Sequence, residues 1–128
     1  MTAEILVVDD ERLIRWSLRE RLTAAGFAVR EAETGLEAVD AFAARTPSLV
    51  LLDLALPELD GMDVLKSVRR MDPACPVIVM SAHDSPGSSS RALELGAARF
   101  LPKPFDVDTL VALVVATIAE GTGGNPPV

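Results

Sequence analysis

Five side chains that could take part in phosphoryl chemistry each stand at the end of an apolar run. Asp9 and Asp10 follow ILVV, Asp53 follows LVLL, Ser81 follows VIVM, and Lys103 follows ARFLP. A charge placed directly after a buried run is costly unless it is paired or needed for chemistry. Carboxylates can hold a hard cation, while a hydroxyl and an ammonium group can bind phosphoryl oxygens. The pattern therefore indicates chemistry on a phosphoryl group, provided that the fold brings these residues together.

The order of apolar runs predicts a fold that would bring these residues together. Short apolar runs alternate with helical patterns, which favours an α/β fold with a doubly wound five-stranded parallel sheet and helices on both faces. The first, third and fourth runs are continuous and indicate interior strands, so we predict the flavodoxin-like order 2-1-3-4-5. The expected strands are 5–8, 28–32, 49–52, 77–80 and 99–101, and the expected helices are 13–25, 36–44, 64–71, 92–95 and 107–119.

Such a sheet places the five candidate residues at one edge. Ligands of open parallel sheets bind beyond the carboxyl ends of the strands, at the point where the strand order reverses. Three neighbouring carboxylates raise one another's pKa unless a hard cation lies among them, so we expect bound Mg²⁺. With that charge neutralised, a carboxylate can attack phosphorus and form an acyl phosphate. The second strand, which ends in acidic residues 31–33, is expected to contribute no residue to this site.

Composition limits the other classes of function. The 128 residues suit one domain, expected at 1–120, and the Gly- and Pro-rich residues 121–128 are expected to form a flexible tail or the start of a linker. No apolar run approaches the roughly 18 residues of a membrane span, and there is no basic leader, so we expect a soluble cytoplasmic protein. The net charge of -7 argues against direct nucleic-acid binding by this segment. The single Cys75 is expected to be a thiol without a role.

The sequence resembles the CheY-like receiver domain of two-component response regulators over about residues 3–120. The resemblance is carried by the Asp9-Asp10 pair, by DLALPELDG around Asp53, by MSAH around Ser81 and by FLPKPF around Lys103. The stretches IRWSL, MSAH and FLPKPFDVD are most similar to the nitrogen-regulator (NtrC-like) branch.

The resemblance implies a phosphoacceptor and a metal site. Asp53 would accept a phosphoryl group from the histidine of a sensor histidine kinase. Asp10, Asp53 and the backbone carbonyl of Ala55 would bind Mg²⁺, with Asp9 acting mostly through water. The chain would be a signalling phosphoacceptor with self-phosphorylation and self-dephosphorylation only, and not a metabolic enzyme.

The resemblance also implies a switch. Ser81 would hold a phosphoryl oxygen, Lys103 would pair with the phosphoryl group, and Phe100 would be the switch aromatic. The Lys103–Pro104 bond is expected to be cis, because the loop must aim Lys103 at Asp53. The change of conformation would control an output domain or partner protein, expected to act in transcription.

Other interpretations compete with this one. Haloacid-dehalogenase-type phosphatases also use a strand-end Asp, a Ser or Thr, a Lys and Mg²⁺, but they need a second Asp where this chain has Ala55. A degenerate, non-phosphorylated interaction module is the second alternative. Taken singly, Asp9 and Asp10 could be helix caps and His83 a passive loop residue. A nucleotide-binding fold is disfavoured, since neither a dinucleotide glycine motif nor a P-loop follows the first strand.

Two helices are expected to present unusual surfaces. Trp16 lies opposite Ile14, Leu18, Leu22 and Ala25 on the first helix, so it should be at least partly exposed. The last helix should begin after Asp106 and bury Val107, Leu110, Val111, Val114 and Ile118, with Ala112, Ala116 and Ala119 facing outward. We expect a homodimer, or the docking of a partner, through that last helix. Gly and Pro in DSPGSSS predict that the fourth helix is short.

Overall fold

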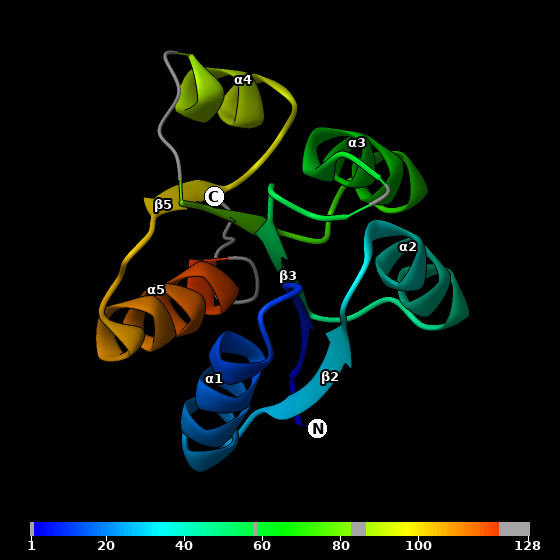
Figure 1. Ribbon diagram of the computed structural model, residues 1–128. Helices are drawn as coiled ribbons and strands as arrows, with labels where there is room; N and C mark the ends of the chain where they lie inside the picture. Colours follow the sequence, from blue (N-terminus) through cyan, green and yellow to red (C-terminus); the bar gives the residue numbers. More distant parts are fainter. Residues whose placement is uncertain (1, 58, 83–86, 121–128) are drawn as a thin grey trace.

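Five strands alternate with five helices in the part of the chain that the structure describes (Figure 1). The computed structural model describes residues 2–57, 59–82 and 87–120. The strands are all parallel, in the order β2-β1-β3-β4-β5. This confirms the predicted doubly wound, flavodoxin-like α/β fold. The elements are β1 Glu4–Val8, α1 Arg12–Ala24, β2 Ala28–Ala32, α2 Gly35–Ala44, β3 Leu49–Asp53, α3 Gly61–Met71, β4 Val77–Ser81, α4 Ser88–Glu94, β5 Arg99–Pro102 and α5 Val107–Ala119.

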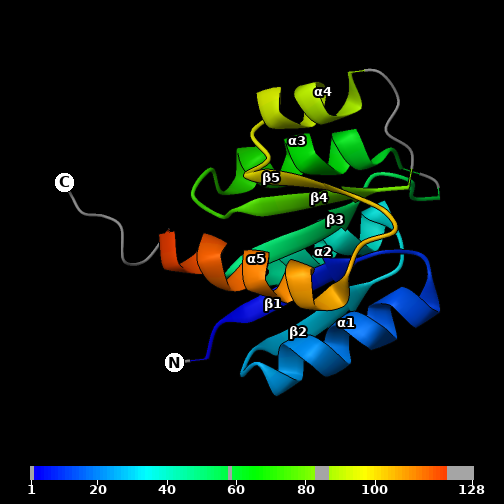
Figure 2. The same cartoon turned by 90° about the vertical axis from the view of Figure 1, so that its left-hand side faces the viewer.

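The sheet is covered on both faces, and alternate strand residues supply the two cores. Leu6 and Val8 of β1 pack in one core with side chains of α2, α3 and α4, whereas Ile5 and Val7 pack in the other with α1 and α5. This follows from the period of two in a strand, which sends successive side chains to opposite faces. Figures 1 and 2 show α1 and α5 side by side on one face, with α3 and α4 on the other.

The three interior strands explain why their sequences are continuous apolar runs. All five residues of β3 are buried, and so are all five of β4. The edge strands β2 and β5 have mixed burial, as their mixed sequences predicted. Asp53 is the last residue of β3 and only 2% exposed, so its carboxylate is held at the end of a fully buried central strand.

The predicted surfaces of the helices are mostly confirmed. Trp16 is 60% exposed and Leu13 is 79% exposed. Ala25 was predicted on the buried face of α1, which is wrong, because it is exposed where the helix ends. The fourth helix is short, with seven residues in Ser88–Glu94. His83 and the first part of the DSPGSSS stretch lie outside the described residues.

The last helix confirms its predicted cap and outward stripe. The Asp106 side chain accepts hydrogen bonds from the backbone of Asp108 and Thr109, and the three alanines of the stripe are exposed. Thr117 was not predicted on the buried face, yet it is 4% exposed. Its hydroxyl donates to the Leu113 carbonyl at 2.7 Å, which satisfies its polar atom within the helix. No helix in the described ranges is both long and apolar enough to cross a membrane.

Gly61 provides a test of how tightly the loop after β3 is packed. A Cβ atom there would lie 2.4 Å from Leu54 Cα and 2.7 Å from the Leu54 carbonyl oxygen, both backbone atoms. We expect Gly61→Ala to lower the free energy of unfolding by about 1–3 kcal/mol in urea titrations, because the backbone beside Asp53 must shift.

The matched control is Gly35→Ala. Gly35 is also the first residue of its helix, but the atoms nearest to its Cβ would be the side-chain atoms Leu59 Cβ and Val64 Cγ2, each at 2.8 Å. A smaller loss is therefore expected for Gly35→Ala, because the closest atoms at Gly35 belong to side chains and those at Gly61 belong to the backbone. Equal losses in the two variants would contradict the backbone clash.

Candidate functional site

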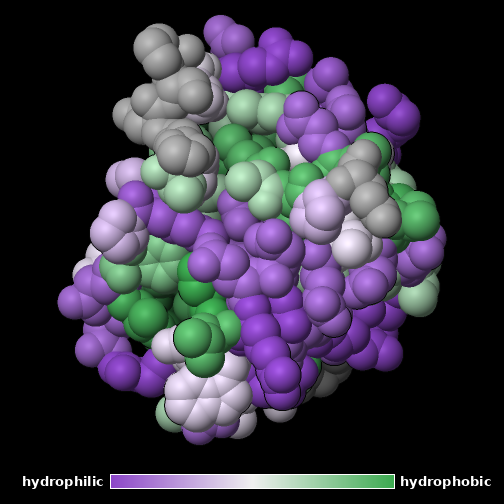
Figure 3. Space-filling model, viewed as in Figure 1, coloured by the Kyte–Doolittle hydropathy of each residue, from purple (hydrophilic) through white to green (hydrophobic). Residues whose placement is uncertain are grey.

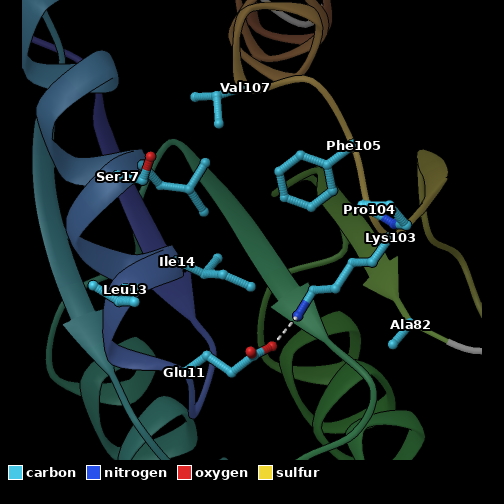
Figure 4. A pocket seen from close by; sticks show the side chains of 10 residues that line it. Glu11, Leu13, Ile14, Ser17, Ala82, Lys103, Pro104, Phe105 and Val107 are labelled. Atoms are coloured by element: carbon cyan, nitrogen blue, oxygen red, sulfur yellow. Dashed lines mark hydrogen bonds and ion pairs between the residues drawn. The ribbon is translucent and has the colours of Figure 1, made fainter.

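One lysine ammonium lies among three carboxylates at the carboxyl edge of the sheet. Lys103 Nζ is 2.8 Å from Asp9 Oδ2, 3.1 Å from Asp53 Oδ2 and 3.3 Å from Glu11 Oε1. Figure 4 shows the Lys103 side chain reaching toward Glu11. An ammonium group carries three donors and no acceptor, so three acids satisfy it completely. The Lys103 and Asp53 side chains are 7% and 3% exposed and that of Asp9 is fully buried, so the contacts of Lys103 with the two aspartates are formed largely out of water. Glu11 is 59% exposed.

The parallel register places these residues at the same level. Val8 pairs with Leu52, so Asp9 and Asp53 extend side by side from the ends of β1 and β3. Ser81 ends β4 opposite Pro102, and its carbonyl accepts a hydrogen bond from the Lys103 backbone N–H at 2.7 Å. The Lys103–Pro104 bond is cis, as predicted.

Three aspartates form a cluster suited to a hard cation. Carboxylate oxygens of Asp9, Asp10 and Asp53 all lie within 4.8 Å of one another. Asp9 and Asp53 are buried, while Asp10 is exposed. Hydrogen bonds orient two of them, because Glu11 N–H donates to Asp9 Oδ1 at 2.8 Å and Ala55 N–H donates to Asp53 Oδ1 at 3.0 Å. Oxygen ligands with excess negative charge are the donor set that magnesium and calcium prefer.

The surroundings shift the titration of two members of the site. Burial raises the pKa of Asp53, the charge of Asp9 adds to this, and the hydrogen bonds from Ala55 and Lys103 only partly oppose it. Burial alone would lower the pKa of Lys103, but hydrogen bonds to Asp9 and Asp53 outweigh burial and raise that pKa. Lys103 is therefore a permanent cation here, and Asp53 bears a negative charge that its surroundings disfavour.

The other predicted site residues lie nearby in different settings. Ser81 is 6% exposed at the end of β4. Phe100 of β5 is half-buried and packs against the core on the α2, α3 and α4 face. Ala55 is exposed two residues beyond Asp53 and has no side-chain carboxylate. The structure thus gathers Asp9, Asp10, Asp53 and Lys103 directly, with Ser81 and Ala55 at the same edge.

Comparison with known proteins identifies the family. Residues 5–115 match the response regulator receiver domain family. The chain belongs to this family. The prediction from the sequence is therefore confirmed, and this receiver domain is the receiver part of a two-component response regulator.

Curated relatives of the receiver domain are longer proteins. The DNA-binding transcriptional regulator NtrC of Klebsiella pneumoniae is 42% identical over 114 residues, which are 89% of this chain and 24% of that protein. The response regulator MprA of Mycobacterium sp. (strain KMS) is 40% identical over 127 residues, which are 99% of this chain and 55% of that protein. The chain thus spans about a quarter to about half of these relatives.

Solved structures agree with the fold. The CheY-like receiver domain protein of Methanospirillum hungatei JF-1 superposes with a TM-score of 0.93 at 25% identity, covering 96% of this chain and 98% of that chain. NtrX of Brucella abortus, in complex with ADP, superposes with a TM-score of 0.87 at 34% identity, covering 94% of this chain and 28% of that chain.

Two residues beside the receiver site were not predicted from the sequence. Glu11 binds Lys103, and Arg15 donates to the Asp9 backbone carbonyl at 2.7 Å. Arg15 also binds Glu31 of β2, the strand that was expected to contribute nothing. A signal was present, because Arg15 lies three and seven residues before the buried Leu18 and Leu22, on the apolar face of α1.

A cavity of about 500 Å³ opens beside the acidic cluster, between α1 and the segment after β5. Figure 3 shows hydrophobic side chains gathered in this region next to a hydrophilic centre. In Figure 4, Ile14 and Phe105 point into the cavity and Lys103 and Glu11 meet at its edge. The cavity thus borders the site through Glu11 and Lys103. The lining residues are Glu11, Leu13, Ile14, Ser17, Leu18, Ala82, Lys103, Pro104, Phe105 and Val107.

The raised pKa of Asp53 predicts a pH-dependent cost to the fold. A carboxyl group whose pKa is higher in the folded than in the unfolded protein destabilises the fold once it is ionised in both. We expect Asp53→Asn to raise the free energy of unfolding at pH 7 in EDTA. The gain should shrink as the pH falls and vanish below the ordinary pKa of 3.8, where Asp53 is protonated in both states.

Urea titrations over a range of pH measure this effect. Asp40→Asn, which removes an exposed carboxylate on α2, is the control and should show no comparable gain. Loss of stability in Asp53→Asn at pH 7, or a gain that persists at acidic pH, would show that burial of the Asp53 charge does not determine its effect on stability.

Proposed function

We propose that Asp53 of this receiver domain accepts a phosphoryl group from the phosphohistidine of a sensor histidine kinase. A carboxylate oxygen of Asp53 forms a bond to phosphorus, the phosphorus–nitrogen bond breaks, and the imidazole leaves with its electron pair. The observation that supports this most strongly is the contact of one buried lysine with both Asp53 and Asp9. That ammonium can stabilise the negative charge that develops on the phosphoryl oxygens during the transfer.

The same site fits Mg²⁺. Asp9, Asp10, Asp53 and the backbone carbonyl of Ala55 would hold the ion, in keeping with the three clustered carboxylates. The ion would supply positive charge between the carboxylates and the phosphoryl oxygens. The raised pKa of Asp53 in the metal-free protein fits this proposal, because the cluster has more negative charge than Lys103 alone compensates.

Ser81 and Phe100 would convert phosphorylation into a change of shape. The Ser81 hydroxyl, at the same edge of the sheet, would donate to a phosphoryl oxygen. Phe100 lies next to Val79 across the β4–β5 pair and is only half-buried, so it has room to change its packing. A ligand shifts such an equilibrium by its differential contacts in the two states, typically about 1–3 kcal/mol.

The domain is proposed to act as a signalling phosphoacceptor and not as a metabolic enzyme. Haloacid-dehalogenase-type turnover needs an acid and base two residues after the nucleophile, and Ala55 offers none. The output is proposed to be transcriptional, because the NtrC relative is a DNA-binding transcriptional regulator. DNA contact would come from another module, since this segment has a net charge of -7.

Phosphorylation by a small phosphodonor tests the function directly. Incubated with Mg²⁺ and acetyl phosphate, the wild-type protein should gain one phosphoryl group by intact-mass measurement. Asp53→Ala should gain none, and Asp10→Ala should lose the Mg²⁺-dependent adduct while remaining folded by circular dichroism. Asp40→Asn, on the exposed side of α2, should be phosphorylated like wild type.

Uptake of a phosphoryl group by Asp53→Ala would show that another residue is the phosphoacceptor. Uptake by Asp10→Ala at the wild-type rate would remove the metal assignment. A wild-type protein that gains no adduct would favour the degenerate interaction module.

The outer side of α5 is proposed to bind a second copy of the domain. Ala112, Ala116 and Ala119 are exposed, and Val115 beside them is 49% exposed. Small side chains let two helices approach closely, and the uncharged patch would be removed from water. The Arg99–Glu120 ion pair, at 2.6 Å, borders this surface. Phosphorylation would favour the dimer if the β5 end of the sheet repacks.

Sedimentation velocity, with and without beryllofluoride as the phosphoryl mimic, tests this surface. The mimic should increase dimerisation, and Ala116→Glu should reduce it by placing a charge in the contact. Ala43→Glu, at an exposed position on α2, is the matched control and should behave like wild type. A mimic without effect, or an Ala116→Glu variant that dimerises normally, would exclude α5 as the interface.

A further inference from the structure

Arg15 is a buried cation whose partners lie in two segments, the turn after β1 and the end of β2. Its side chain is 9% exposed and projects from α1. Nη1 donates to the Asp9 backbone carbonyl at 2.7 Å, Nε donates to Glu31 Oε1 at 3.0 Å, and Nη2 lies 3.9 Å from Glu33 Oε1. A buried guanidinium requires such partners, and its planar fork can serve two acceptors in fixed directions.

The Asp9 carbonyl that Arg15 binds belongs to the peptide unit joining Asp9 to Asp10. The orientation of this unit sets the direction in which the exposed Asp10 side chain leaves the backbone. On the other side, the Asp9 N–H donates to the Ala32 carbonyl at 3.1 Å, and the Asp9 carboxylate accepts from Glu11 N–H at 2.8 Å. Arg15 supplies the only side-chain donor to this peptide unit among the contacts of the described residues.

A fixed peptide unit matters because the three aspartates repel one another. Without a bound cation, repulsion would drive the exposed Asp10 carboxylate away from Asp9 and Asp53. A preorganised ligand avoids the cost of bringing it back when a cation binds. Glu31 supports this arrangement, because its carboxylate accepts a hydrogen bond from Arg15 Nε at 3.0 Å and also pairs with Arg19.

We propose that Arg15 is a positioning residue for divalent-cation binding, which holds the Asp9–Asp10 peptide unit so that the Asp10 carboxylate faces Asp9 and Asp53. The inference rests on the proposed Mg²⁺ site. It adds a residue that touches neither cation nor phosphoryl group, and it links the edge strand β2 to the site through Glu31.

Arg19 provides a matched control within the same helix. Arg19 also binds Glu31, through the other carboxylate oxygen, and its Nη2 donates to the Val29 carbonyl at 3.3 Å. Both of these contacts lie on β2, away from the Asp9–Asp10 peptide unit. Leu22→Ala is the control for stability, because Leu22 is fully buried near the far end of α1 and its truncation weakens the same helix away from the site.

The test is calorimetric titration of Mg²⁺ into the unphosphorylated full chain. Arg15→Met should weaken Mg²⁺ binding about tenfold, the lower end of what loss of a group behind the metal ligands typically costs. Arg19→Met and Leu22→Ala should bind within about twofold of wild type. In ¹H–¹⁵N spectra without metal, the Asp10 amide should shift in Arg15→Met and not in Arg19→Met. Arg15→Lys, which keeps the charge without the fork, should bind with intermediate affinity.

Each remaining result overturns the proposal. If Arg15→Met and Arg15→Lys bind Mg²⁺ as tightly as wild type, Arg15 has no positioning role although the metal site stands. If Leu22→Ala loses as much affinity as Arg15→Met, the loss reflects weakening of α1 and not the contact with Asp9. If the wild-type protein binds no Mg²⁺, the positioning role and the proposed metal site fall together. Should Arg15→Met not fold, the Mg²⁺ affinities of Arg15→Lys and Arg19→Met are compared instead. Equal affinities would then overturn the proposal.

Discussion

Repulsion among carboxylates at one edge of the sheet is the constraint on which this structure depends. Asp9, Asp10 and Asp53 have oxygens within 4.8 Å of one another, and two of the three residues are buried. The Lys103 ammonium, bound to Asp9 and Asp53, offsets part of that repulsion. The remainder persists as the raised pKa of Asp53, so the metal-free site holds negative charge that a bound cation would offset.

The sheet must be rigid for the charges to stay so close. Asp53 is the last of five buried residues in β3, which lies between β1 and β4 and is packed on both faces. Gly61 supports the loop beyond Asp53, where no side chain fits between α3 and the Leu54 backbone. Apolar packing thus stabilises an arrangement that its own electrostatics opposes, as expected at a functional site.

Some side chains of the surrounding elements hold the site in place, and others form exposed surfaces. Arg15 of α1 and Glu31 of β2 connect the edge of the sheet to the Asp9–Asp10 turn. In contrast, Leu13 and Trp16 of α1 and the alanines of α5 are exposed to solvent. One helix therefore has a buried face that holds the acidic turn and an outer face that is exposed to solvent.

The sequence by itself determined the order of the strands, the edge at which the site lies and the identity of its main residues. Those features depend on local patterns, since a continuous apolar run marks an interior strand and the next polar residue marks its end. Only the tertiary structure decided that Lys103 contacts Glu11 as well as Asp9 and Asp53, that Arg15 binds the Asp9 carbonyl, and that Thr117 is buried. Helical spacing can place Arg15 and Thr117 on a buried face, but the partners of Lys103 and Arg15 depend on how distant segments pack, which no spacing along one segment determines.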